Sequence, residues 1–510
     1  MVILSLACSA CVSAGAKEYT TTLTGDRAAD TEYADAYVDD HTVQFGVEDT
    51  INPADPNANA IRVRKGTSLT IRTDGTLNTG VKWVEDASLP GGGSWKGSGI
   101  NVDGRLDVKG QLQTMGLFAG TADDAGTINV DGGNFGSIAS MNKGAIININ
   151  MKEDGTPGDN VVVIGQTIPF TEGGGLHVMQ GDVNIALTTP QSLFQGGFMC
   201  NGAPLHRTSI YLSNGAQWNV DYWEPRNFLT KFKGGKNKDT RGIMNLPDKI
   251  MEYGGGQPMK INNYSGYTLI NYGRMIVDTP VAGELTIDSA EKGSYLTLRT
   301  DRNGLEEDQG QVDAVLEKLA NKLIYTGYVT GERHLLGELE IAEGLTAGTS
   351  IWKNRSISFD EQGRGHLLSK INLPITGTPA DILYAAYADE GFNTYTFPTP
   401  IVIDTGDTAA IQAAKPIAIT GKLTVYGDIA LDHGSVSINR SGEGILPDAP
   451  TVLAGDLRGE GSARIGLGKY SAWRGAALQK GALDLAMEEA IWENAAQKAA
   501  ERGSRVERLQ

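Results

Sequence analysis

The sequence predicts an all-β protein, a right-handed parallel β-helix (solenoid) with inserted loops and one short helical insertion. Short segments alternate apolar and polar residues, as at Leu69 and Ile71, which is the period of a strand with one buried face. The string INVDG occurs twice, at residues 100 and 128. Four further strands within residues 417–439 are separated by glycines six and seven residues apart, which bend the chain rather than reverse it: Gly421, Gly427 and Gly434.

The first element is an apolar run from Val2 to Val12, followed by Ala14-Gly15-Ala16. This small-x-small pattern before Lys17 predicts that residues 1–16 are a signal peptide lacking its basic n-region. The alternative is a lipoprotein at Cys8 or Cys11, although neither is preceded at the right distance by leucine. Cleavage after Ala16 would leave Cys200 as the only cysteine, which excludes a disulfide framework within one chain.

The next elements are a cap and the coils of the helix. Residues 17–62 are rich in aspartate and show little periodicity before a strand at Val43, Phe45 and Val47, so they are expected to form an irregular N-terminal cap over an open strand edge. Residues 63–456 are expected to be β-helix coils, interrupted by insertions at 223–262 and 301–330. The second insertion should contain a helix over 311–325 that packs outside the coils through one apolar face: Val312, Val315, Leu316, Leu319 and Leu323.

The last elements are C-terminal coils over residues 457–496 and a charged, helix-prone tail over 497–510. Trp473 and Trp492 lie nineteen residues apart. This spacing predicts that they occupy successive coils and stack on each other as structural aromatics.

The charge balance limits the class of partner. The chain has 44 lysines and arginines against 61 aspartates and glutamates, a net charge of −17. A general nucleic-acid or anionic-membrane binder needs clustered positive charge, so we exclude nucleic acid as a partner.

Catalytic and metal-binding motifs are missing from the sequence. No Gly-x-Ser-x-Gly elbow, phosphate loop or His-x-x-x-His pair occurs, and a calcium-like loop at 301–308 has Leu305 where an oxygen ligand is needed. Asp103, Asp107 and Asp131 are interpreted as corner residues that bind backbone. We therefore predict no catalytic residue, cofactor or metal.

One local concentration of positive charge stands out, and we call it the basic cluster: Lys231, Lys233, Lys236, Lys238 and Arg241. It has two interpretations, a solvated loop or a contact site for an acidic glycan or protein that is steered there by charge.

The stretch SAWRGAALQKGALDLAMEEAIW, residues 471–492, resembles the final coils of autotransporter (type V secretion) passenger domains, which are pertactin-like β-helices. The residues that match are Ser471, Trp473, Gly475, Gly481, Leu483, Asp484, Leu485, Ala490 and Trp492. Residues 319–365 also resemble long autotransporter passengers in their general sequence pattern. The resemblance implies export across the inner membrane, passage through an outer-membrane β-barrel translocator, and folding driven from the C-terminal coils.

A complete autotransporter continues into that barrel, whereas no series of membrane strands follows Trp492 here. We expect a truncated gene, a fragment, or a passenger exported by a partner barrel. By analogy, the function would be that of a non-enzymatic adhesin at the cell surface or in the medium, binding host or bacterial surface glycans or proteins. The chain would stay in the periplasm if no barrel is available. The alternatives are a secreted β-helix polysaccharide lyase or hydrolase and a structural surface-layer element.

Overall fold

The computed structural model is an all-β protein whose sheets consist mainly of parallel strands and curl into near-barrels, so the predictions of an all-β class and of short parallel strands are confirmed. It describes most of residues 61–493 together with strands at 21–23, 36–38 and 41–45. The longer gaps are 86–92, 166–174, 201–205, 221–227, 247–258, 274–282, 343–350 and 379–392. The expected signal peptide (1–16) and tail (497–510) lie outside the described residues.

The chain forms two compact units. Unit 1 contains residues 1–271 and 278–285, and unit 2 contains residues 272–277 and 286–510. The strand β23 (Leu285–Ala290) begins in unit 1 and continues in unit 2.

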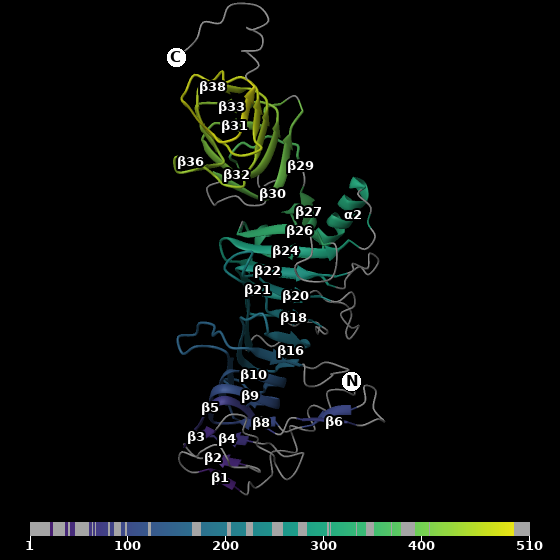
Figure 1. The fold of residues 1–510 in the computed structure, drawn as a ribbon, viewed down its shortest axis with the longest axis vertical. Coiled ribbons are helices and arrows are strands. Elements are labelled where there is room, and N and C mark those ends of the chain that lie inside the picture. The colour runs from purple at the N-terminus through teal and green to yellow at the C-terminus, as the bar shows by residue number, and fades with distance from the viewer. Residues whose placement is uncertain are drawn as a thin grey trace, which may run out of the picture. The chain divides into compact units, whose positions relative to one another are not determined.

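Unit 1 consists of three ladders of parallel strands, and Figure 1 shows its strands stacked on one another. The first ladder runs through β1 (Thr21–Leu23), β2 (Ala36–Val38), β4 (Ile61–Val63), β8 (Gly99–Val102), β9 (Arg105–Ala119), β10 (Thr127–Ser140), β13 (Gly175–Val178) and β16 (Gly197–Cys200). The second runs through β3 (His41–Phe45), β5 (Ser68–Asn78), β9, β10, β11 (Ile146–Ile149), β14 (Gly181–Leu187), β17 (His206–Leu212), β19 (Lys231–Lys233) and β21 (Met259–Ser265). The third runs through β5, β9, β10, β12 (Val162–Ile164), β15 (Leu193–Gln195), β18 (Gln217–Asn219), β20 (Gly242–Asn245) and β22 (Tyr267–Asn271).

The core of unit 1 lies between these ladders. Because side chains alternate along a strand, one residue in two points inward, and parallel pairing places these residues above one another. One such column is fully buried, with every member 0% exposed: Leu69, Leu106, Ile128, Ile147 and Val183. Outside the ladders, β6 (Lys82–Glu85) and β7 (Gly93–Lys96) form an antiparallel hairpin.

The first part of unit 2 combines strands with the helical insertion. Here β24 (Ser294–Asp301) pairs in parallel with β26 (Leu335–Ala342), and β27 (Ile351–Phe359) and β28 (Gly365–Leu368) follow antiparallel. The helix α2 (Gln309–Ala320) begins after Asp308, whose side chain accepts a hydrogen bond from the Gln311 amide. It packs against β24, β26 and β28 through buried Val312, Leu316 and Leu319.

The helix is shorter than the sequence indicates. Residues 323–325 form β25 (Leu323–Tyr325), so Leu323 belongs to a strand, and a single turn, α3 (Thr326–Val329), follows. At the end of α2 the Asn321 side chain donates to the Glu317 carbonyl at 2.6 Å. This side-chain bond competes with the backbone hydrogen bond that would extend the helix. The helix therefore ends at Ala320, although the apolar pattern continues to Leu323.

The second part of unit 2 again forms three parallel ladders. One runs through β30 (Thr394–Asp404), β32 (Pro416–Tyr426), β34 (Ser435–Ile438), β39 (Ser462–Leu467) and β41 (Leu483–Met487). Another runs through β29 (Lys370–Ile371), β30, β32, β37 (Thr451–Ala454), β40 (Ala472–Arg474) and β42 (Ile491–Glu493). The third contains β31 (Ile411–Ala413), β33 (Ile429–Leu431) and β38 (Leu457–Gly459), while β35 (Arg440–Ser441) and β36 (Gly444–Ile445) form a small hairpin.

Two segments differ from the expected organisation. Residues 223–262, expected to interrupt the coils, contain β19, β20 and the start of β21, all paired within the ladders. Residues 17–62 contain β1 and β2 in parallel pairs, in addition to β3, which covers Val43 and Phe45 of the expected strand. The physical reason is strand length: a strand of three residues such as β19 buries one side chain, Phe232, so its sequence shows no alternation.

Candidate functional site

The basic cluster starts on a strand of the second ladder. In β19, Lys231 and Lys233 flank Phe232, which is fully buried, so both lysines point away from the core. Parallel pairing sets Lys231 beside Ser209 and Lys233 beside Tyr211 of β17. The ladder therefore fixes the backbone of these two cations.

The rest of the cluster lies on an ordered turn. Asn237 Oδ1 accepts hydrogen bonds from the amides of Asp239 and Thr240, at 3.1 and 3.0 Å. Thr240 Oγ1 in turn accepts from the amides of Lys236 and Asn237, at 2.9 and 3.1 Å. Lys236 and Lys238 are exposed on this turn, and Arg241, half-buried, pairs through its backbone with Ser213. Five cations within eleven residues are thus carried on a backbone with defined geometry.

A row of amide side chains runs along the second ladder toward the cluster, and we call it the first amide row: Asn129, Asn148 and Asn184. Asn148 Nδ2 donates to Asn129 Oδ1 at 2.8 Å, and Asn184 Nδ2 donates to Asn148 Oδ1 at 2.8 Å. Asn129 Nδ2 donates to a carboxylate oxygen of Asp107 at 2.6 Å. Asn184 is in register with Ser209, and Ser209 with Lys231.

The third ladder holds a second amide row of the same kind: Gln195, Asn219, Asn245 and Asn271. Its three donor-acceptor distances are 2.8, 2.7 and 2.9 Å. None of its members is a charged residue, so the second row is chemically matched to the first.

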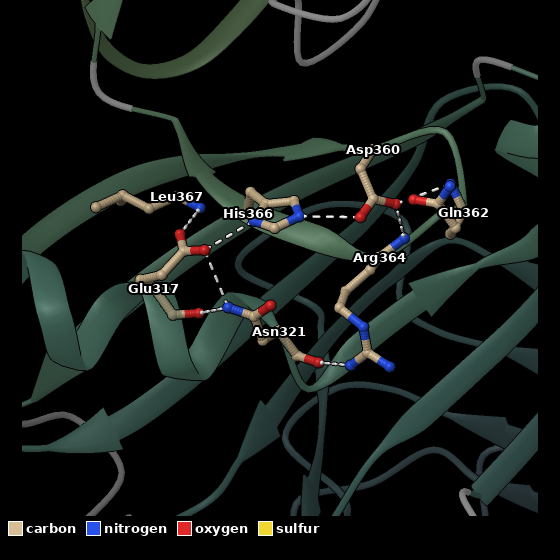
Figure 2. Close-up of polar contacts among 7 residues, drawn as sticks. All are labelled: Glu317, Asn321, Asp360, Gln362, Arg364, His366 and Leu367. Carbon is tan, nitrogen blue, oxygen red and sulfur yellow. Dashed lines mark hydrogen bonds and ion pairs between the residues drawn. The ribbon is translucent and has the colours of Figure 1, made fainter.

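In unit 2 a histidine joins helix α2 to the β27–β28 hairpin (Figure 2). His366 Nδ1 lies 2.7 Å from Glu317 Oε1, and His366 Nε2 lies 3.1 Å from Asp360 Oδ2. The other oxygen of Glu317 accepts from the Leu367 amide at 2.7 Å, and Arg364 Nη1 donates to the Asn321 carbonyl at 2.7 Å. Three contacts from the hairpin therefore hold the C-terminal end of α2, and the fourth, between His366 and Asp360, lies within the hairpin.

The electrostatics of this network favour a protonated imidazole. Burial lowers the pKa of His366, but the hydrogen bonds that its ring donates to Glu317 and Asp360 outweigh it, so the pKa is raised above its ordinary value of 6.5. Burial likewise opposes ionisation of Glu317 and Asp360, yet their hydrogen bonds leave the pKa of each carboxyl lowered. With both ring nitrogens donating to carboxylates, His366 has no lone pair to act as a general base. The arrangement is a cross-link between α2 and the hairpin.

A comparison of the chain with protein-family models, with curated proteins and with solved structures finds no match.

Each strand of a ladder is one rung, and the C-terminal rungs are held together by repeated contacts. Trp473 pairs in register with Trp492, and the two rings stack at 4.9 Å with 10° between their planes. Each indole N–H donates to a glycine carbonyl one rung earlier, Trp473 to Gly455 at 3.0 Å and Trp492 to Gly475 at 3.2 Å. The nineteen-residue interval in the sequence is therefore one step of this ladder.

Asp484 fastens the same rungs from outside. It accepts from Arg440 Nη2 at 2.8 Å and from Arg464 Nε at 3.1 Å. The Arg440 side chain is only 3% exposed, so this carboxylate is the counter-charge of a buried cation. Asp484, which lies in β41 between Leu483 and Leu485, therefore holds the β35–β36 hairpin and β39 against β41.

The remaining sequence candidates have structural partners. Asp107 lies within β9 and pairs with the Arg105 side chain at 2.7 Å, so its expected role as a corner residue that binds backbone is wrong, whereas Asp131 accepts from a backbone amide, that of Gly110, at 3.1 Å. Asp308 caps α2. Within the described part of the chain, no group of three or more His, Cys, Asp or Glu side chains could hold a metal ion, and no helix is long and apolar enough to cross a membrane.

The amide rows and the His366 network were not anticipated from the sequence. The only signal for the first row is Asn129 within the second INVDG string. The members of the His366 network lie 49 and 6 residues apart and meet only because α2 packs on the hairpin.

Proposed function

We propose that the chain is a right-handed parallel β-helix and the passenger of an autotransporter-like protein, a non-enzymatic adhesin exported to the cell surface or the medium. The sets of three parallel ladders support the coil assignment, since one strand per ladder completes one coil. The contacts of Trp473, Trp492 and Asp484 support it further, because they give structural roles to the residues that resemble passenger C-termini.

The observation that carries the binding role is the fixed basic cluster on an otherwise acidic molecule. A ladder rung and a hydrogen-bonded turn already order the backbone of these cations, so ligand binding need not order that backbone as well. A chain with net charge −17 repels anions elsewhere, so an acidic ligand is directed to this patch. The proposed partners are acidic glycans or proteins of a host or bacterial surface.

The test is charge removal without loss of the fold. Deletion of the cluster would remove β19, so each cation should instead be replaced by glutamine in the full chain. The control replaces five exposed lysines outside the cluster by glutamine: Lys143, Lys152, Lys292, Lys318 and Lys422. Binding to heparin and to cells should fall at least tenfold in the cluster variant and stay unchanged in the control, since each phosphate-like contact contributes about 1 kcal/mol or more.

Equal binding by the two variants would contradict the adhesin proposal at this site. Release of cleavage products from an acidic polysaccharide would favour the enzyme alternative, and ordered arrays without cell binding would favour the surface-layer alternative.

A further inference from the structure

The first amide row and the basic cluster share one outward-facing column of the second ladder. Consecutive parallel registers join its members in order: Asp107, Asn129, Asn148, Asn184, Ser209 and Lys231. Neighbouring rungs of a sheet are about 4.7–4.9 Å apart. The column is therefore a polar track that leads from Asp107 to the cations of β19.

The amides of this track all point the same way. Each Nδ2 donates toward the earlier rung, so each Oδ1 faces the later rung, and the row starts at the Asp107 carboxylate. An amide has two N–H donors and two acceptor lone pairs, and the row uses one of each on Asn129 and Asn148. Both side chains are half-buried, so each amide is partly accessible to solvent and keeps one N–H and one lone pair that the row does not use.

We infer that the ligand of the basic cluster is a linear acidic polysaccharide, which lies along this column with its hydroxyls on the amide row and a carboxylate or sulfate at Lys231 and Lys233. The inference rests on the proposed function, since it names the ligand class of the same site. A hydroxyl group can both donate and accept a hydrogen bond, so it can pair with the N–H and the lone pair that each amide does not use within the row.

The chemistry of the column favours a polysaccharide over a protein. Its six members are polar, so it offers no apolar pocket of the kind that anchors a protein partner. Identical donor–acceptor pairs repeated at rung spacing suit a polymer with a repeating polar edge. Charge complementarity then selects an acidic polymer, because the cations lie at one end of the column.

The experiment compares two matched variants of the full chain. Asn148→Thr removes the middle of the first row and breaks its bonds to Asn129 and Asn184. Asn245→Thr does the same in the second row, breaking the bonds to Asn219 and Asn271. Equal circular dichroism and equal urea midpoints would show that the two variants are equally folded.

The probes are heparin oligosaccharides of increasing length and uncharged dextran, measured by calorimetry. Asn148→Thr should weaken heparin binding about five- to tenfold, the value of one or two hydrogen bonds to an amide, while Asn245→Thr leaves it unchanged. The loss should appear only for oligosaccharides long enough to reach from Lys231 to Asn148, and dextran should not bind.

Equal affinity of the two asparagine variants, together with a loss in the cation variant, would overturn the polysaccharide track and leave the proposed function standing. Unchanged binding in all three variants would overturn both. Binding of surface proteins without any binding of heparin would identify a protein ligand and also overturn the inference.

Discussion

At the scale of single residues, Gly475 shows how closely successive rungs approach. A Cβ added there would lie 1.8 Å from the Gly455 carbonyl oxygen, the same oxygen that accepts the Trp473 indole N–H. No side chain fits without moving one backbone away from the other.

We expect Gly475→Ala to destabilise the C-terminal rungs by about 2–3 kcal/mol, the usual cost of overpacking. Hydrogen exchange of the β40 and β42 amides measures this directly. The control is Gly444→Ala, where the nearest atom to the new Cβ lies at 3.5 Å, and it should leave exchange unchanged. Equal protection in both variants would show that the rungs separate more easily than the contact indicates.

Asp484→Asn should also loosen the last rungs, because it leaves the buried Arg440 guanidinium without its counter-charge. Charged hydrogen bonds of this type contribute about 1.5–3 kcal/mol, and we expect a loss of that order in the free energy of unfolding. Faster exchange in β39 and β41 is the readout. Glu489→Gln, which breaks an exposed pair with Lys469 at 3.6 Å, should have no measurable effect.

The sequence revealed inward residues better than outward ones. Leu106, Ile128 and Ile147 are recognisable because alternation identifies a buried position without any knowledge of its neighbour. Asn129 and Asn148 become meaningful only once their registers are known. Which residues are partners on a ladder depends on the three-dimensional structure, so the amide row could not be predicted from the sequence.

At the scale of elements, β19 and α2 show opposite kinds of sequence signal. The helix is long enough for its apolar face to be visible, and only its end is shifted, by the Asn321 side chain. By contrast, β19 contributes one buried residue, Phe232, between two lysines. In the sequence this Lys-Phe-Lys segment cannot be distinguished from a solvated loop. Length therefore decided which elements could be predicted.

The docking of α2 should depend on pH. The raised pKa of His366 means that its stabilisation is complete below its ordinary pKa of 6.5 and is lost as pH rises through the higher folded value. The lowered pKa of Glu317 acts in the opposite sense, so its contribution is complete above 4.5 and is lost on acidification. The cross-link should be strongest between about pH 4.5 and 6.5.

Hydrogen exchange of the α2 amides, corrected for the intrinsic pH dependence, should accordingly speed up as the pH rises above 6.5 through the raised pKa of His366. His366→Gln should abolish this step, because the imidazolium is gone. His433→Gln alters a histidine whose side chain is 74% exposed and should retain the step. A step that persists in His366→Gln would assign the pH dependence to another group.

At the scale of the whole molecule, the proposal of an exported passenger makes a prediction about the native cell. Limited proteolysis of intact cells followed by mass spectrometry should release peptides of this chain, and its N-terminal peptide should begin at Lys17. A cytosolic protein of the same cell is the control for lysis. Detection of the chain only inside cells would contradict the proposed localisation.

The rungs of unit 1 differ in length while their partners stay matched. Asn148 follows Asn129 by 19 residues and Asn184 follows Asn148 by 36, yet both amide contacts measure 2.8 Å. Extra residues must therefore leave the ladder at the corners and return to the same register. We therefore expect the fold to tolerate insertions and deletions at the corners between strands, but not substitutions of residues that face the core or form the hydrogen-bonded amide column. A foreign epitope placed in the long rung between Asn148 and Asn184 would accordingly be displayed without disturbing the strands on either side.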